Sequence, residues 1–92
     1  MLYCVRMDVR VPHGVDSEYF ERLKAEEKAR AQELQRAGKW PHLWRVAGQY
    51  ANISILDVAN HDELHALLSS LPLFPFMDIV VTPLARHPSA ID

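Results

Sequence analysis

Residues 43–55 read LWRVAGQYANISI and decide the fold, because two short strand-like runs lie on either side of one glycine. The runs cover residues 43–46 and 50–55, and Gly48 between them permits a tight reversal of the chain. The sequence therefore predicts a β-hairpin near the middle of the chain. The elements on either side of this hairpin determine the sheet that it joins.

A helix is predicted on each side of the hairpin. On the N-terminal side, Asp16 or Ser17 can cap a helix that runs to about residue 37, and Gly38 stops it. On the C-terminal side, Asn60 and Glu63 resemble a capping box. Leucines then follow at positions i, i+3, i+4 and i+7, the spacing of a one-sided apolar helix. Prolines end this helix at positions 72 and 75.

The outermost predicted elements are strands. Residues 3–11 alternate with a period of two, with apolar side chains at the odd positions, and residues 77–83 supply a final strand. The predicted order is strand, helix, strand, strand, helix, strand. This order is the ferredoxin-like βαββαβ arrangement of the α+β class, a four-stranded antiparallel sheet with two helices on one face.

One face of such a sheet stays uncovered, which favours self-association. The 92 residues form a single domain, and a chain this short buries a limited share of its surface. Trp44 and Val46 offer apolar material for burial. We therefore predict a homo-oligomer with sheets packed face to face, as in a dimeric α+β barrel. Residues 84–92 have no core of their own, and we expect this tail to contact a neighbouring subunit.

Composition argues against nucleic acid and membranes as partners. The net charge is −2, and ten Lys and Arg are scattered among twelve acids, without the basic stripe of a nucleic-acid groove. No apolar run approaches the roughly 18 residues of a membrane span, and no signal peptide opens the chain. We expect a cytoplasmic protein. The lone Cys4 is interpreted as a small apolar strand residue.

Glu27 is the candidate catalytic residue. On a helical projection it falls inside the apolar arc of Phe20, Leu23, Ala31 and Leu34, whereas the neighbouring charges point away. A carboxylate facing a cavity between helix and sheet would have a raised pKa and could accept a proton from a weak carbon acid. The alternative is a surface carboxylate that bends to solvent or pairs with Lys24 or Arg30.

Polar and aromatic side chains of the hairpin could complete a site. Arg45 suits a substrate carboxylate, and Tyr50 or Asn52 can donate to an oxyanion. His42 lies in the same cluster, but strand alternation divides the cluster between two faces. Phe76 could form an apolar pocket wall. For each of them, ordinary cross-strand or core packing is the alternative.

The sequence gives no indication of a cofactor or metal. His61 and His65 stand four apart with an acid after the first, which partly resembles a zinc-binding helix, but no third ligand is evident. No Gly-rich phosphate loop or Ser-His-Asp pattern is present. Cofactor-free chemistry is what these residues leave open.

Segments along the whole chain resemble the muconolactone delta-isomerase family. They are MLY at 1–3, LKAEEK at 23–28, HLWR at 42–45, LPLFPFMDI at 71–79 and HPS at 87–89. After HLWR, the residues Gly48, Tyr50, Ala51 and Asn52 also match. The resemblance implies a ferredoxin-like, cofactor-free, decameric isomerase of the β-ketoadipate pathway. Such an enzyme converts muconolactone into 3-oxoadipate enol-lactone.

The resemblance also implies roles for individual residues. Glu27 matches the family's acid, which would carry the proton of the 1,3-shift. Tyr50, Asn52 or His42 would donate to the lactone carbonyl, and the substrate carboxylate would be held by Arg45 or, second, by Lys24. The alternatives are a 5-chloromuconolactone dehalogenase, which expels chloride after the same proton abstraction, and a ferredoxin-like module that binds a small anion without turnover.

Overall fold

The structure, a computed structural model, describes residues 1–92. The helices and strands follow one another in the predicted order, which confirms the ferredoxin-like α+β fold. They are β1 (Leu2–Val9), α1 (Ser17–Arg36), β2 (His42–Arg45), β3 (Ala51–Asp57), α2 (His61–Ser69) and β4 (Met77–Leu84), with a short 3₁₀ helix at Phe74–Phe76.

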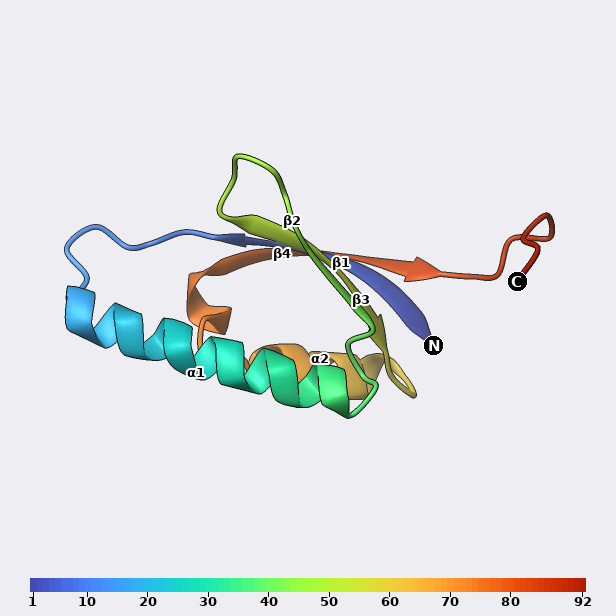
Figure 1. Ribbon diagram of the computed structural model, residues 1–92, viewed down its shortest axis with the longest axis horizontal. Coiled ribbons are helices and arrows are strands. Elements are labelled where there is room, and N and C mark those ends of the chain that lie inside the picture. The colour runs from blue at the N-terminus through green and yellow to red at the C-terminus, as the bar shows by residue number, and fades with distance from the viewer.

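The four strands form one antiparallel sheet in the order β2-β3-β1-β4, and both helices cover the same face of it (Figure 1). Val5 of β1 lies between Ser54 of β3 and Val81 of β4. Because side chains alternate along a strand, this register fixes which residues face the helices.

The core lies between the sheet and the helices. Tyr3, Val5 and Met7 on the helix-facing side of β1 are at most 1 % exposed. They pack with the apolar stripes of both helices and with Leu56 of β3. The alternating pattern of the first strand and the leucine spacing of α2 therefore predicted the core correctly.

The helix that carries Glu27, α1, is closed at both ends. Asp16, and not Ser17, is the N-cap, since its side chain accepts a hydrogen bond from the Tyr19 backbone N–H at 2.9 Å. At the other end Gly38 has φ +78°, and the Lys39 N–H donates to the Leu34 carbonyl at 3.0 Å. This closure ends the helix as predicted and turns the chain toward β2.

The start of α2 departs slightly from the predicted capping box. Asn60 accepts from the Glu63 N–H at 2.8 Å, as expected, but the Glu63 carboxylate accepts from the N–H of Ala59 at 2.9 Å instead of from Asn60. His61 is hydrogen-bonded to the hydroxyl of Tyr3. This histidine is therefore part of the packing between α2 and β1.

Several boundaries differ from the sequence prediction by one or two residues, and one short helix was not predicted. β1 ends at Val9 instead of residue 11, because Asp8 and Val9 are its last residues with partners on β3 and β4. The 3₁₀ helix at Phe74–Phe76 was not predicted, and Pro75 lies within it. This turn brings the chain from the end of α2 into β4.

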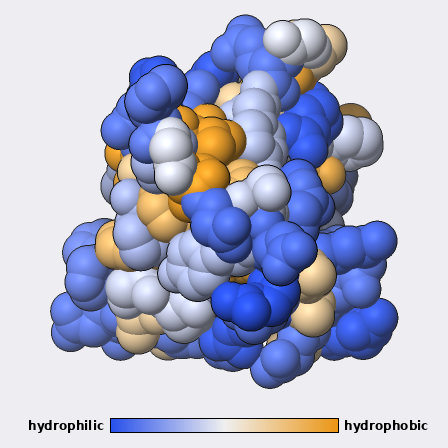
Figure 2. Space-filling model, turned by 90° about the vertical axis from the view of Figure 1, so that its left-hand side faces the viewer, coloured by the Kyte–Doolittle hydropathy of each residue, from blue (hydrophilic) through white to orange (hydrophobic).

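The second sheet face is uncovered and partly apolar. Trp44 is 66 % exposed and Val80 is 61 % exposed, and half-buried Cys4, Ile53 and Ile55 lie on the same face. By contrast, the end of the molecule that carries the start of α1 is largely hydrophilic, with one apolar area in the upper half of the view and paler, smaller ones toward the edges (Figure 2). Neither helix combines the length and the apolar character needed to cross a membrane.

The tail after β4 extends beyond the rest of the molecule (Figure 1). Residues 85–92 are all exposed. Their hydrogen bonds join Arg86 to the carbonyls of Ala90 and Asp92, and the Ser89 and Ala90 N–H groups to His87, all within the tail. The tail therefore adds nothing to the hydrophobic core of the chain.

Candidate active site

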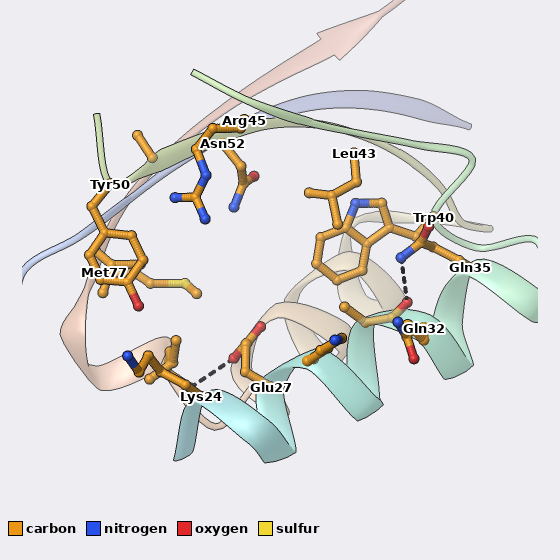
Figure 3. Close-up of a pocket in the computed structure, with 15 residues that line it drawn as sticks. Lys24, Glu27, Gln32, Gln35, Trp40, Leu43, Arg45, Tyr50, Asn52 and Met77 are labelled. Atoms are coloured by element: carbon orange, nitrogen blue, oxygen red, sulfur yellow. Dashed lines mark hydrogen bonds between the residues drawn. The ribbon is translucent and has the colours of Figure 1, made fainter. Parts of the chain in front are cut away.

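A cavity of about 440 Å³ lies between α1 and the β2-β3 side of the sheet (Figure 3). One wall comes from α1, the opposite wall from the hairpin, and the end from the segment that leads into β4. Fifteen residues line it: Val9, Lys24, Glu27, Lys28, Ala31, Gln32, Gln35, Trp40, Leu43, Arg45, Tyr50, Ala51, Asn52, Leu73 and Met77.

Glu27 is the one acidic residue of this lining. Its side chain is half-buried and points into the cavity, on the helix face that also buries Phe20, Ala31 and Leu34 (Figure 3). Burial raises the pKa of Glu27 above its ordinary value, and a hydrogen bond from the Leu73 backbone partly offsets this shift. The carboxyl group is thereby adapted to accept a proton.

The surface alternative for Glu27 is not realised. Lys24 pairs with Glu21 at 2.7 Å, and Arg30 pairs with Glu33 at 2.9 Å. The hydrogen bond from the Leu73 N–H to Glu27 Oε1, at 2.9 Å, is instead made across 46 positions of the sequence. With one oxygen held in this way, the carboxyl group has a fixed orientation in the cavity.

The Leu73 N–H is available because of the local sequence. It follows Pro72, directly before the 3₁₀ helix, and the Leu73 side chain is 4 % exposed and anchored in the interior. A helix would have used this N–H internally, whereas the proline-rich connection leaves it free. Sequence reasoning missed this contact, since the Leu-Pro-Leu-Phe-Pro segment gave no sign of which side chain it would meet.

Hydrogen-bond donors face Glu27 from the hairpin (Figure 3). Arg45 of β2 and Asn52 of β3 are direct cross-strand partners, so both project from the helix-facing side of the sheet. The Arg45 guanidinium lies 5.4 Å from the centre of the Tyr50 ring. The cavity therefore has a proton acceptor on its helix wall and donors on its hairpin wall.

Two lysines border the cavity beside Glu27. Lys24 was predicted, and its ion pair with Glu21 raises the pKa of its ammonium group. Lys28 was predicted to point away from the apolar arc like the other charge next to Glu27, but the structure places it in the cavity lining, where it makes no ion pair within 4 Å. Together with Arg45, these residues give the cavity a net positive lining, which suits an anionic ligand.

His42 and Phe76 do not line the cavity. His42 pairs with Ile55, one position out of phase with the Leu43–Ser54 and Arg45–Asn52 pairs, so alternation places it on the opposite sheet face. Phe76 packs edge to face against Phe20, with 5.7 Å between ring centres. The predicted donor role of His42 and the predicted wall role of Phe76 are therefore corrected.

The apolar part of the cavity comes from residues that sequence reasoning did not select. Trp40 is 2 % exposed and forms one end wall together with Leu43, next to Gln32 and Gln35 of α1 (Figure 3). A tryptophan two residues after the Gly38 helix stop was an available signal, since so large a side chain seldom stays in solvent. Leu43 shares its strand face with Arg45 and could have been assigned by alternation.

Comparison with known proteins gives one consistent result. The family model described as Muconolactone delta-isomerase matches residues 1–90. A Cupriavidus pinatubonensis protein named Muconolactone Delta-isomerase is 63 % identical over 91 residues and covers 99 % of both chains. The Pseudomonas aeruginosa protein of the same name is 55 % identical, covering 99 % of this chain and 95 % of the relative.

A solved structure agrees with these relatives. The crystal structure of a muconolactone isomerase at 3.3 Å resolution superposes with a TM-score of 0.95 at 53 % identity, covering 100 % of this chain and 96 % of that chain. The similarity thus includes the helix that carries Glu27 and both walls of the cavity.

Proposed function

Because the chain belongs to the muconolactone delta-isomerase family and is an isomerase, we propose that it converts muconolactone into 3-oxoadipate enol-lactone at the Glu27 cavity. The observation that carries this proposal is the half-buried carboxyl group of Glu27, with a raised pKa, facing hydrogen-bond donors across a cavity. This arrangement suits proton transfer between two carbons that are activated by conjugation with a carbonyl group.

The reaction moves one proton and one double bond. Glu27 takes the proton from the ring carbon that bears the carboxymethyl arm, and the electron pair of that C–H bond becomes the new ring double bond. The original double bond shifts its electrons toward the lactone carbonyl, which gives a dienolate. Glu27 then returns a proton to the carbon beside the carbonyl. Atoms and electrons balance without a cofactor.

Tyr50 and Asn52 stabilise the dienolate in this proposal. Negative charge develops on the carbonyl oxygen, so a donor placed there lowers the barrier more than it stabilises the neutral lactone. Both residues line the hairpin wall. His42 is left out of this role, because it lies on the other face of the sheet.

Arg45 holds the carboxylate of the substrate. Without a cation at the far end of the ligand, this carboxylate would be repelled by ionised Glu27. Arg45 lies on the wall opposite Glu27, and its planar fork matches a carboxylate. Lys24 is the second choice for this role, because it already forms an ion pair with Glu21. Lys28, which is unpaired, adds positive charge to the wall that carries Glu27.

We also propose that the protein works as a cytoplasmic homo-oligomer, a decamer, in the β-ketoadipate pathway. The exposed apolar residues of the uncovered sheet face, above all Trp44 and Val80, support association through that face. The tail of residues 85–92 is exposed along its whole length and would lie on a neighbouring subunit.

Proton NMR of muconolactone mixed with the protein in heavy water tests the function. An isomerase produces the rearranged lactone and can incorporate deuterium beside the carbonyl, whereas a module that only binds small anions does neither. The dehalogenase alternative is not favoured, because the relatives described above are named as isomerases. Release of chloride from the chlorinated lactone without turnover of muconolactone would reverse this assignment.

A further inference from the structure

Ser54 is the only polar residue among the buried residues of the protein, with an exposure of 0 %. It lies on the helix-facing side of β3, two positions after Asn52, and its Oγ is 2.7 Å from Asn52 Oδ1. A buried hydroxyl group is costly unless it is hydrogen-bonded. The bond to Asn52 satisfies it at the back of the cavity.

The hydroxyl proton determines which way the Asn52 amide faces. The carboxamide oxygen of Asn52 is the acceptor that the Ser54 hydroxyl reaches. If the amide were reversed, its NH₂ group would face Ser54, and the buried hydroxyl proton would lose this acceptor. The satisfied arrangement therefore turns the oxygen toward Ser54 and the NH₂ group toward the cavity, as Figure 3 shows.

Arg45 makes this orientation consequential. It is the direct cross-strand partner of Asn52, and its guanidinium group only donates hydrogen bonds. An Asn52 oxygen without a partner would be drawn to that guanidinium group. The Asn52 amide would then turn its NH₂ group away from the cavity. Its oxygen would accept a hydrogen bond from Arg45, the cation that the substrate carboxylate needs.

We propose that Ser54 is a positioning residue, which holds the Asn52 amide with its NH₂ group toward the substrate and keeps its oxygen from Arg45. This inference rests on the proposed function for the reaction that the NH₂ group assists. The chemistry it serves is donation to the lactone oxygen on which charge develops. Ser54 itself does not line the cavity and touches no reacting atom.

A double-mutant cycle on turnover tests the inference. Ser54→Ala should lower kcat about fivefold, the effect of one neutral hydrogen bond, with a smaller change in KM. In the Asn52→Ala background, the same Ser54→Ala change should alter kcat by less than about twofold, because there is no amide left to orient. Ser70→Ala, which removes a hydroxyl outside the cavity lining, serves as the control and should leave kcat unchanged.

Equal losses in both backgrounds would overturn the inference, because Ser54 would then act through general packing. An unchanged kcat in Ser54→Ala would also overturn it. NMR relaxation of the Asn52 side-chain ¹⁵NH₂ group gives a readout that needs no turnover: the amide should be ordered in the parent and mobile in Ser54→Ala. If the parent failed to isomerise muconolactone, the proposed function would fall, and this NMR comparison alone would decide the orientation. An Asn52 amide that is equally ordered in the parent and in Ser54→Ala would refute the positioning role of Ser54.

Discussion

The backbone N–H of Leu73 donates a hydrogen bond to the carboxyl group of Glu27 at 2.9 Å, and so ties the middle of α1 to the segment that leads into β4. One carboxyl oxygen is held by this bond. The other accepts no hydrogen bond within the protein and is free for the proton transfer that we propose. Burial and this single bond act in opposite directions on the pKa of Glu27, and burial has the larger effect.

Glu27→Gln should abolish most turnover. The amide keeps the shape and can still accept the bond from Leu73, but it cannot take a proton, so kcat should fall about 10²- to 10⁴-fold. Thermal unfolding should occur at the same or a higher temperature, since a partly buried charge is removed. Glu26→Gln, on the exposed side of α1, is the matched control. Near-parental turnover of Glu27→Gln would refute the role of Glu27 as the base.

Activity should rise with pH through the pKa of Glu27. The base must be ionised, and the pKa of Glu27 is raised above 4.5 by burial, so the acid limb of kcat/KM should have an apparent pKa above 4.5. A pH–rate profile measures this directly. An acid limb at or below 4.5 would contradict a desolvated base.

Stability should change with pH in the opposite sense. A raised pKa in the folded state means that folding favours the protonated form of Glu27. The contribution of Glu27 to the free energy of unfolding is therefore fully present below about pH 4.5, its ordinary pKa, and is lost as the pH rises through the pKa of the folded state. Relative to Glu27→Gln, the parent should therefore become less stable over this range. Denaturant unfolding of both proteins between pH 4 and 8 checks the difference, and a difference independent of pH would argue against the shift.

Arg45→Met should weaken substrate binding. Losing a charge-assisted bond to the substrate carboxylate should raise KM roughly tenfold to hundredfold with a smaller change in kcat. Arg45→Lys should recover part of the loss, since it keeps the charge but not the planar fork. Lys24→Met should have a smaller effect, because Lys24 is already paired with Glu21. Steady-state kinetics compare the three variants, and an unchanged KM in Arg45→Met would remove Arg45 from this role.

Trp44→Glu should reduce the proposed oligomer to smaller species. Trp44 is 66 % exposed on the uncovered sheet face, and a charge there would oppose burial against a second sheet. Sedimentation velocity gives the mass. Ala29→Glu, on an exposed position of α1, is the control expected to keep the parental mass. If Trp44→Glu also kept the parental mass, the proposal that subunits associate through this face would be wrong.

The sequence determined the fold because its elements are specified locally. The alternation of residues 3–9, the leucine spacing of α2 and the glycines at 38 and 48 each act over a few neighbouring residues. The inward direction of Glu27 follows from helical periodicity in the same way. These features need no knowledge of distant contacts, so they could be predicted.

Only the tertiary structure decided what surrounds Glu27. The hydrogen bond from the Leu73 N–H joins residues 46 positions apart in the sequence, and the end wall formed by Trp40 depends on how the segment after α1 packs into the core. The position of His42 depends on the phase of β2 against β3, and a shift of one residue would have exchanged the two faces. Local pattern cannot supply that phase, because it is set by the packing of the whole sheet against the helices.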